Sequence, residues 1–221
     1  MKLFKLCVVI IVTIPIVTAG IAVASTLEEI KARGHIKVGV NESLFGFSKA
    51  DENGVWRGLD VDTARAISAA VFGDPDKIKY VPLTAKTRFT ALQSGEIDVL
   101  TRNCTQTLTR ETALGLNFVH VNYYDGQGFL VPKSLDVKSA RELDGRSLCV
   151  LPGTTTELNL ADYFRANGMK MEPVVIESTP ELAKAFFAGR CDVLTSDASQ
   201  LASTRVVAPN PDDYIILPEI I

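Results

Sequence analysis

The sequence has few of the residues on which most catalytic and metal sites depend. It holds two histidines, one tryptophan and four cysteines in 221 residues. His35 and His120 stand apart from one another, and no group of Cys and His has the spacing of metal ligands. The Gly-x-Ser-x-Gly motif of many hydrolases is also missing. The sequence therefore does not indicate catalysis by a metal ion or by a nucleophile paired with histidine.

Runs of basic residues and long apolar segments are lacking too. The chain has 23 Lys and Arg against 26 Asp and Glu, which gives a net charge of −3. Binding of nucleic acid requires a basic patch, so this function is not expected. A membrane-spanning helix needs about 20 apolar residues. Only a shorter apolar run is present, at residues 6–19.

This run has the features of a secretory signal peptide. Lys2 and Lys5 precede it, and an Ala-Val-Ala sequence ending at Ala24 follows it. A transmembrane anchor is the alternative, but the run is short and Pro15 interrupts it. We expect cleavage after Ala24 and export of the remaining chain. Removal of two lysines and no acidic residue leaves a net charge of −5.

The rest of the chain alternates short apolar segments with amphipathic helical segments. This alternation predicts α/β structure, with parallel strands covered by helices on both faces. Residues 92–100 (LQSGEIDVL) and 187–194 (FAGRCDVL) echo each other. The echo predicts two similar lobes with a boundary near residues 123–128. Residues 116–121 are predicted to form a strand, and Thr179 is predicted to cap the helix that follows it.

Three cysteines remain after the predicted cleavage. Cys149 lies in an apolar run at residues 147–151, and Cys191 opens another at residues 191–194. If these runs are neighbouring strands, a disulfide between the two cysteines is geometrically feasible, and export permits it. Two buried free thiols are the alternative. Cys104 is left over, and the alternation of the chain predicts that it faces the core.

The segment after the apolar strand at residues 97–100 shows the clearest pattern for ligand binding. Asn103 and Thr105 alternate, so their side chains point to the same side, and Arg110 follows at a helix start. A guanidinium matches a carboxylate with two parallel hydrogen bonds. Small ligands bind beyond the carboxyl ends of strands in open α/β sheets. The segment predicts a pocket for a small carboxylate, and a solvated arginine beside a helix cap is the alternative.

Further candidates lie elsewhere in the chain. Thr154, Thr155 and Thr156 stand between a strand and a helix, where free N–H groups bind anions, although ordinary capping also explains them. Asp197 comes just after a strand and either binds an ammonium group or caps the next helix. Arg88 is either another anion contact or a solvated side chain.

Five segments carry a resemblance to a known family. The chain resembles periplasmic solute-binding proteins of amino-acid ABC transporters, and among them those of general, broad specificity. The resemblance extends over nearly all of the chain after Ala24. Its segments are residues 58–65 (GLDVDTAR), 82–98 (PLTAKTRFTALQSGEID), 107–110 (TLTR), 123–128 (YYDGQG) and 153–159 (GTTTELN).

The resemblance implies a two-lobed periplasmic binding protein fold of type II. Residues 1–24 would be the signal peptide, residues 25–124 the first lobe and residues 125–221 the second lobe. The lobes would close on one L-amino acid and deliver it to an inner-membrane ABC permease. The resemblance implies a monomer with neither a cofactor nor a catalytic step.

The resemblance also divides the candidate residues by the part of the amino acid that they contact. Asp197 would bind the α-ammonium group. Arg88 would contact the ligand side chain, as in relatives that bind acidic amino acids. The α-carboxylate would be held from both lobes by Asn103, Thr105, Arg110, Thr154, Thr155 and Thr156.

The chain departs from specialised relatives in ways that favour broad specificity. Binders of acidic amino acids carry Arg and His where this chain has Asn41 and Thr179, and many binders of basic amino acids carry an aromatic residue where it has Leu44. Family members also continue past Glu219. We therefore expect a chain truncated at its C-terminus, without the return crossing of the hinge and the last part of the first lobe.

Three alternatives to a transport function remain. A cyclohexadienyl-dehydratase-like enzyme of the same fold would act on prephenate-like acids, and Glu157 is the nearest candidate for its acid. A sensor module would need a membrane anchor or a signalling domain. A truncated product without function is the third alternative.

Overall fold

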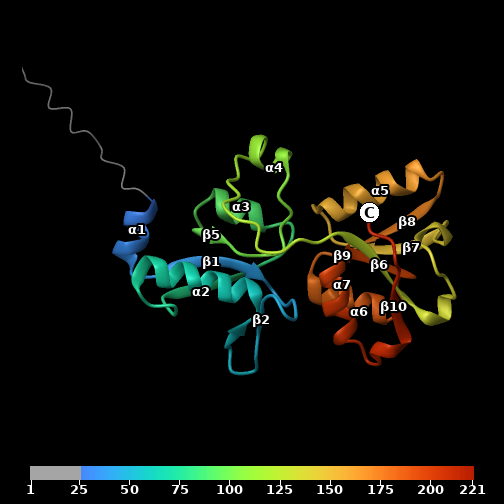
Figure 1. The fold of residues 1–221 in the computed structure, drawn as a ribbon, viewed down its shortest axis with the longest axis horizontal. Helices are drawn as coiled ribbons and strands as arrows, with labels where there is room; N and C mark the ends of the chain where they lie inside the picture. Colours follow the sequence, from blue (N-terminus) through green and yellow to red (C-terminus); the bar gives the residue numbers. More distant parts are fainter. Residues whose placement is uncertain (1–25) are drawn as a thin grey trace, which may run out of the picture.

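The structure is a computed structural model that describes residues 26–221. The predicted signal peptide and its cleavage after Ala24 lie outside the described residues. Within the described part, no helix has the length and apolar character needed to cross a membrane. The described chain forms two lobes joined by one extended connection (Figure 1).

The first lobe is built on a parallel sheet with the strand order β4-β1-β5. Its apolar residues pack on both faces of the sheet. α1 and α2 cover one face, whereas α3 packs on the other. The elements are α1 (Thr26–Arg33), β1 (Ile36–Asn41), β2 (Lys49–Ala50), β3 (Trp56–Arg57), α2 (Leu59–Phe72), β4 (Ile78–Leu83), α3 (Arg88–Gln93), β5 (Val99–Leu100) and α4 (Leu108–Thr112).

The second lobe contains a five-stranded sheet with the order β10-β6-β9-β7-β8. β7, β8 and β9 are parallel, and β6 runs antiparallel to β9 and β10. The elements are β6 (Gln127–Pro132), η1 (Lys133–Leu135), η2 (Ala140–Glu142), β7 (Arg146–Val150), α5 (Thr155–Ala166), β8 (Met171–Val175), α6 (Thr179–Phe187), β9 (Val193–Asp197), α7 (Ala198–Val206), η3 (Pro211–Asp213) and β10 (Tyr214–Ile216).

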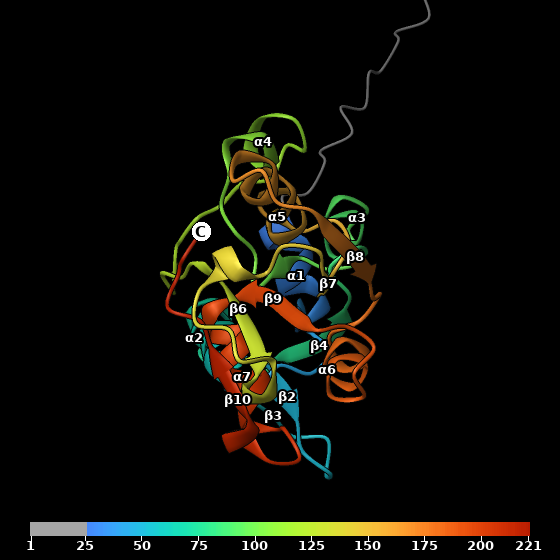
Figure 2. The ribbon, with the colours of Figure 1, turned by 90° about the vertical axis from the view of Figure 1, so that its right-hand side faces the viewer.

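Helices cover both faces of this second sheet because neighbouring strand residues point in opposite directions. Phe129 and Leu148 belong to the core beneath α5, whereas Leu130 and Cys149 belong to the core beneath α6 and α7. Figure 2 shows α5 on one side of the strands and α6 with α7 on the other. The α/β class and the two-lobed arrangement predicted from the sequence are confirmed.

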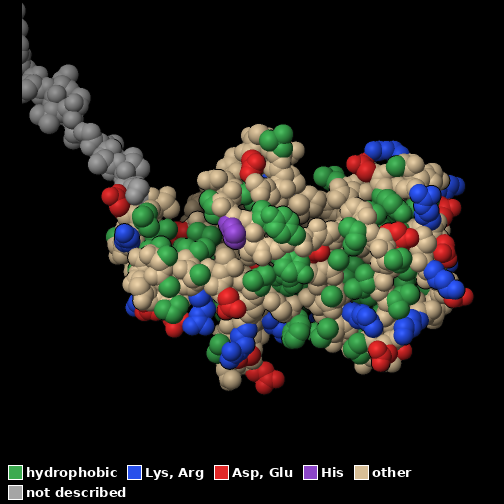
Figure 3. Space-filling view, viewed as in Figure 1, with side chains coloured by type: hydrophobic (Ala, Val, Ile, Leu, Met, Phe, Trp, Pro, Cys, Tyr) green, Lys and Arg blue, Asp and Glu red, His purple; other side chains and the backbone are tan. Residues whose placement is uncertain are grey.

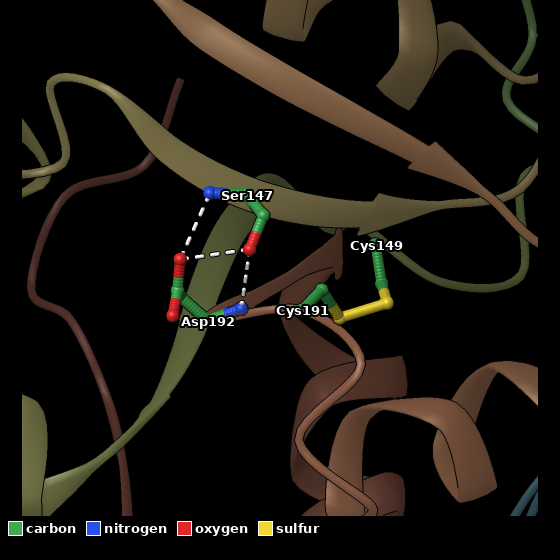
Figure 4. The surroundings of a disulfide bond; sticks show 4 residues. All are labelled: Ser147, Cys149, Cys191 and Asp192. Atoms are coloured by element: carbon green, nitrogen blue, oxygen red, sulfur yellow. Dashed lines mark hydrogen bonds between the residues drawn. A yellow bond between two sulfur atoms is a disulfide. The ribbon is translucent and has the colours of Figure 1, made fainter.

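An aspartate joins neighbouring strands at the amino end of each sheet. In the first lobe, Asp98 precedes β5, and its Oδ2 accepts hydrogen bonds from Arg33 and from the backbone N–H of Lys37. In the second, Asp192 precedes β9, and its Oδ2 accepts from the N–H and the hydroxyl of Ser147 at 3.0 and 2.7 Å (Figure 4). These hydrogen bonds lower the pKa of Asp192. The two similar sequence segments therefore form equivalent contacts, in which an aspartate that precedes one strand is hydrogen-bonded to the neighbouring strand. We call these two contacts the aspartate clamps.

A disulfide lies beside the second clamp. It joins Cys149 in β7 to Cys191, whose Cα atoms are 5.7 Å apart (Figure 4). Both residues are buried in the core beneath α6 and α7. Cys104 has a free thiol and is half-buried. The prediction that it faces the core is wrong, because the chain bends after β5 and does not continue as a regular strand.

The connection between the lobes differs from its prediction. Residues 116–121 form neither a strand nor a helix. β4 and β5 are the edge strands of the first sheet, and no strand of the described chain pairs with residues 116–121. In this connection, the exposed fractions of Val119 and Tyr124 are 84% and 89%. Apolar side chains also gather along the middle of the face in Figure 3, while charged ones lie mainly toward its ends. The lobe boundary after residue 124 falls in this connection and stays a prediction.

A second correction concerns the start of α6. Ser178, not Thr179, is the N-cap, and its hydroxyl accepts a hydrogen bond from the N–H of Glu181. The Thr179 hydroxyl instead accepts from Asn41 Nδ2 at 3.3 Å. The shift by one residue turns Thr179 toward the first lobe, so it contributes to the contact between lobes rather than to the cap.

Candidate ligand-binding site

A small, partly open cavity lies where the carboxyl ends of the two sheets face each other. This is the position at which open α/β sheets bind small ligands. The residues that follow β4 and β5 line it from the first lobe, and those that follow β7 and end β9 line it from the second. Seven of the eight predicted site residues are among its walls: Arg88, Asn103, Thr105, Thr154, Thr155, Thr156 and Asp197.

Hydrogen bonds join the two lobes around this cavity. They are formed by amide and hydroxyl groups from the loops that follow the strands and from the helices of the second lobe. Asn103 Nδ2 donates to Gln200 Oε1 at 2.9 Å, the hydroxyls of Thr105 and Thr155 are 3.1 Å apart, and Asn41 Nδ2 donates to Thr179 Oγ1. The lobes are therefore closed on one another.

Two buried guanidinium groups line the cavity. Arg88 and Arg102 are 2% and 7% exposed, and both donate to the carbonyl of Asn103. Burial, and next the charge of Arg102, lowers the pKa of Arg88 to about 9, so Arg88 stays cationic at neutral pH. Arg88 Nε and Arg102 Nη2 have no hydrogen-bond partner among residues 26–221. The alternative interpretation, that Arg88 is a solvated side chain, is wrong. The residues of the cavity wall include guanidinium donors that are available to an anionic group.

Asp197 supplies a carboxylate to the same cavity. It stands at the start of α7, but its side chain makes no capping hydrogen bond, so a role as a cap does not explain it. Burial raises the pKa of Asp197, and the negative charge of Asp125 adds to this effect. Asn103, Arg88 and Arg102 act in the opposite direction. A cationic group of a ligand would relieve the cost of this buried charge.

The three threonines at the start of α5 differ in their contacts. The Thr154 hydroxyl accepts from the N–H of Glu157 and donates to the carbonyl of Leu151, so it caps the helix, as the simpler alternative states. The Thr155 hydroxyl meets Thr105 across the cavity. Thr156 is buried in the wall, and its carbonyl accepts from a side chain of β6.

Arg110 lies outside the cavity wall. Its Nη1 donates to the carbonyl of Thr105, and its guanidinium carbon lies 5.0 Å from the centre of the Phe89 ring. The side chain is 6% exposed. In this arrangement Arg110 supports the segment that carries Thr105, and its direct contact with a carboxylate stays a prediction.

Comparison with known proteins decides the family. Residues 36–202 match the bacterial extracellular solute-binding proteins, family 3. The chain belongs to this family. The resemblance predicted from the sequence is thereby confirmed.

The similar proteins are binding proteins of amino-acid transport. The general L-amino acid-binding periplasmic protein AapJ of Rhizobium johnstonii is 59% identical over 205 residues, which are 93% of this chain and 60% of that protein. The glutamate/glutamine/aspartate/asparagine-binding protein BztA of Rhodobacter capsulatus is 58% identical over 210 residues, covering 95% of this chain and 62% of that protein. The chain thus spans about three fifths of their length.

A solved structure has the same fold. It is an ABC transporter periplasmic binding protein from Brucella ovis with glutathione bound, 54% identical, with a TM-score of 0.87. The match covers 90% of this chain and 62% of that one. The type II fold of this family-3 protein is confirmed.

Six residues of the cavity wall were not selected from the sequence, and two of them, Arg102 and Gln200, carry buried donors without a partner among the described residues. Arg102 lies between Leu100 and Asn103, where strand alternation gives no reason to select it, but the bend after β5 turns it into the cavity. Gln200 lies in α7, three residues after Asp197. Positions i and i+3 share one face of a helix, and this spacing was the signal that could have identified it.

A buried carboxyl group behind Arg102 leads to a prediction on stability. Asp60 is 2% exposed, and burial raises its pKa to about 6, although Arg102 opposes the shift. Its unfolded pKa is about 3.9, so the folded chain holds this proton more tightly, and stability falls as pH rises from about 4 to 6. We expect Asp60→Asn to raise the free energy of unfolding by about 1–3 kcal/mol at pH 7.5. Urea unfolding at pH 7.5 and 4 checks this, and an equal gain at both pH values would contradict it.

Proposed function

We propose that this chain is the solute-binding component of an amino-acid ABC transporter. It would act in the periplasm as a monomer, after cleavage of residues 1–24. Its two lobes would close on the zwitterion of an L-amino acid and present the closed form to an inner-membrane permease. One observation carries the proposal: a half-buried carboxylate and guanidinium donors that lack a partner among the described residues share one cavity between the lobes.

The charges of the cavity match those of a zwitterion. Asp197 would bind the α-ammonium group, and Arg88 would contact the side chain of the ligand. The names of the Rhizobium and Rhodobacter relatives, a general and an acidic or amide amino-acid binder, support this class of solute. The α-carboxylate would be held by Asn103, Thr105 and Arg110 from the first lobe and by Thr154, Thr155 and Thr156 from the second.

Closure would be a population shift. A ligand that contacts both lobes interacts fully only with the closed state, so its binding energy favours that state. The Thr105–Thr155 and Asn103–Gln200 contacts form only when the lobes meet. The permease would distinguish loaded from empty protein by this change. We infer binding without chemical conversion, since the similar proteins are named for binding.

A thermal-shift screen against the common amino acids tests the proposal. Ligand at 100 times its Kd stabilises the folded state by about 2.7 kcal/mol. For a chain of this size, that corresponds to a rise in Tm of roughly 5–10 °C. We expect several L-amino acids to give such shifts and their D-enantiomers to give none. A flat response to all of them would contradict the proposal and favour a product without function, and turnover of a prephenate-like acid would favour the enzyme.

A further inference from the structure

One buried side chain of the cavity wall joins the two lobes but has no assigned contact with the ligand in the proposed function. Gln200 lies in the first turn of α7 and is 1% exposed. Its Oε1 accepts from Asn103 Nδ2 of the other lobe at 2.9 Å. Its Nε2 has no hydrogen-bond partner among the described residues. A buried N–H left unpaired costs about 1–3 kcal/mol, so a functional state in which this group has a partner is expected.

The neighbours of Asn103 fix which end of the Gln200 amide is free. Asn103 Oδ1 accepts from Arg102 Nη1 and from Asn41 Nδ2, both at 3.0 Å. A guanidinium has only donors, so the atom that it contacts must be the oxygen of Asn103. Asn103 Nδ2 is therefore the donor to Gln200, and Gln200 Oε1 is the acceptor. The NH₂ group of Gln200, a residue of the cavity wall, is left without a partner among the described residues.

Two other free donors belong to the same wall. Arg88 Nε and Arg102 Nη2 are also buried and unpartnered. These three donors, of which two belong to cations, suit oxygen acceptors and disfavour a cationic side chain. Asp197 is the carboxylate of the wall, and the proposed function assigns it to the α-ammonium group. The donors are thus available to the remainder of the ligand.

We propose that Gln200 is a further ligand-binding residue that determines specificity. Its Nε2 donates to a carboxylate or carboxamide oxygen at the end of the ligand side chain, while its Oε1 holds Asn103. Arg102 acts as a positioning residue, because it fixes the amide of Asn103 and through it that of Gln200. This inference rests on the proposed function. Because the Asn103–Gln200 contact crosses between lobes, the side chain is recognised only in the closed state.

Gln200→Met provides the test, because it removes the donor and keeps a similar side-chain volume. Calorimetry at pH 7.5 would compare L-glutamate with L-norvaline. Norvaline has the same number of carbon atoms, with a methyl group in place of the side-chain carboxylate. Loss of the contact between lobes affects both ligands alike, so it cancels in the ratio of their Kd values. We expect the preference for glutamate over norvaline to fall at least tenfold. Gln200→Glu, which can still accept from Asn103, should reduce the preference as well.

Gln93→Met is the matched control. Gln93 ends α3, and its Nε2 donates to the carbonyl of Leu114, outside the cavity wall. This variant should keep the preference of the parent. If both Gln200 variants keep the parent's preference for glutamate over norvaline, the proposed role of Gln200 is wrong. This holds even if both ligands bind more weakly by the same factor. If the parent binds neither ligand, this inference fails, and the thermal-shift screen against all common amino acids decides whether the proposed function fails as well.

Discussion

Asp197→Asn is expected to weaken the binding of amino acids by roughly 30-fold to several thousand-fold, because removal of one partner of a buried charge pair costs about 2–5 kcal/mol. The asparagine has the same shape but cannot neutralise an ammonium group. In the parent, the half-buried carboxylate lies near Asn103, Arg88 and Arg102, and its burial raises its pKa. Arg88 and Arg102 already favour the ionised form, and an ammonium group in the cavity would favour it further. Calorimetric titration at pH 7.5 measures the change in Kd.

Two comparisons sharpen this experiment. Simple carboxylates that lack an ammonium group should lose much less affinity than amino acids, and equal losses would argue against an ammonium partner for Asp197. Asp192→Asn is the matched variant, because it removes the same charge from a residue outside the cavity wall. Its carboxylate binds Ser147 at the opposite end of the sheet. This variant should lower stability while the Kd for amino acids stays within about twofold of the parent, since the two sites are independent.

Replacement of both Cys149 and Cys191 by serine is expected to lower the free energy of unfolding by about 4 kcal/mol. The disulfide closes a loop with a sequence separation of 42 residues, and chain-entropy arguments give about this value for such a loop. Since the two serines would be buried in the core beneath α6 and α7, the loss should not be smaller. Urea unfolding of the oxidised parent and the variant measures the difference, which corresponds to a fall in Tm of roughly 8–16 °C.

Cys104→Ser serves as the control for this prediction. Cys104 is a half-buried free thiol of the first lobe, and its replacement should change stability by less than about 1 kcal/mol. Reducing agent should destabilise the parent and leave the double serine variant unchanged. If the double variant is as stable as the parent, the two cysteines are free thiols in the protein.

The strands that carry the site could be predicted because their sequences are distinctive. β1, β7 and β9 are buried on both faces, so they appear as short apolar runs that end at polar residues. The helices between them have caps and glycine ends that local rules identify. Residues 116–121 have the same apolar character, and their prediction as a strand was wrong. Pairing depends on a neighbouring strand, which the local sequence does not specify.

The positions of some site residues could not be predicted because they also depend on tertiary structure. Asp197 ends β9, and Asn103 and Thr105 come shortly after β5, so their position near the carboxyl ends of strands could be predicted. Arg102 required knowledge of a bend, and Gln200 required knowledge of the face that α7 turns toward the other lobe. The position of Arg110 also depends on tertiary packing, here against Phe89. Contacts between lobes, such as Asn41 with Thr179, lie 138 residues apart in sequence and leave no local signal.

The aspartate clamps have a consequence for the evolution of this scaffold. Asp98 and Asp192 hold the amino ends of the strands, whereas most residues of the cavity wall lie at or beyond the carboxyl ends. Substitutions that accumulate in the wall therefore leave these two aspartate contacts untouched. One framework can acquire a preference for a different solute in small steps without first becoming unstable. We expect that exchange of wall residues between relatives transfers solute preference at little cost in folding.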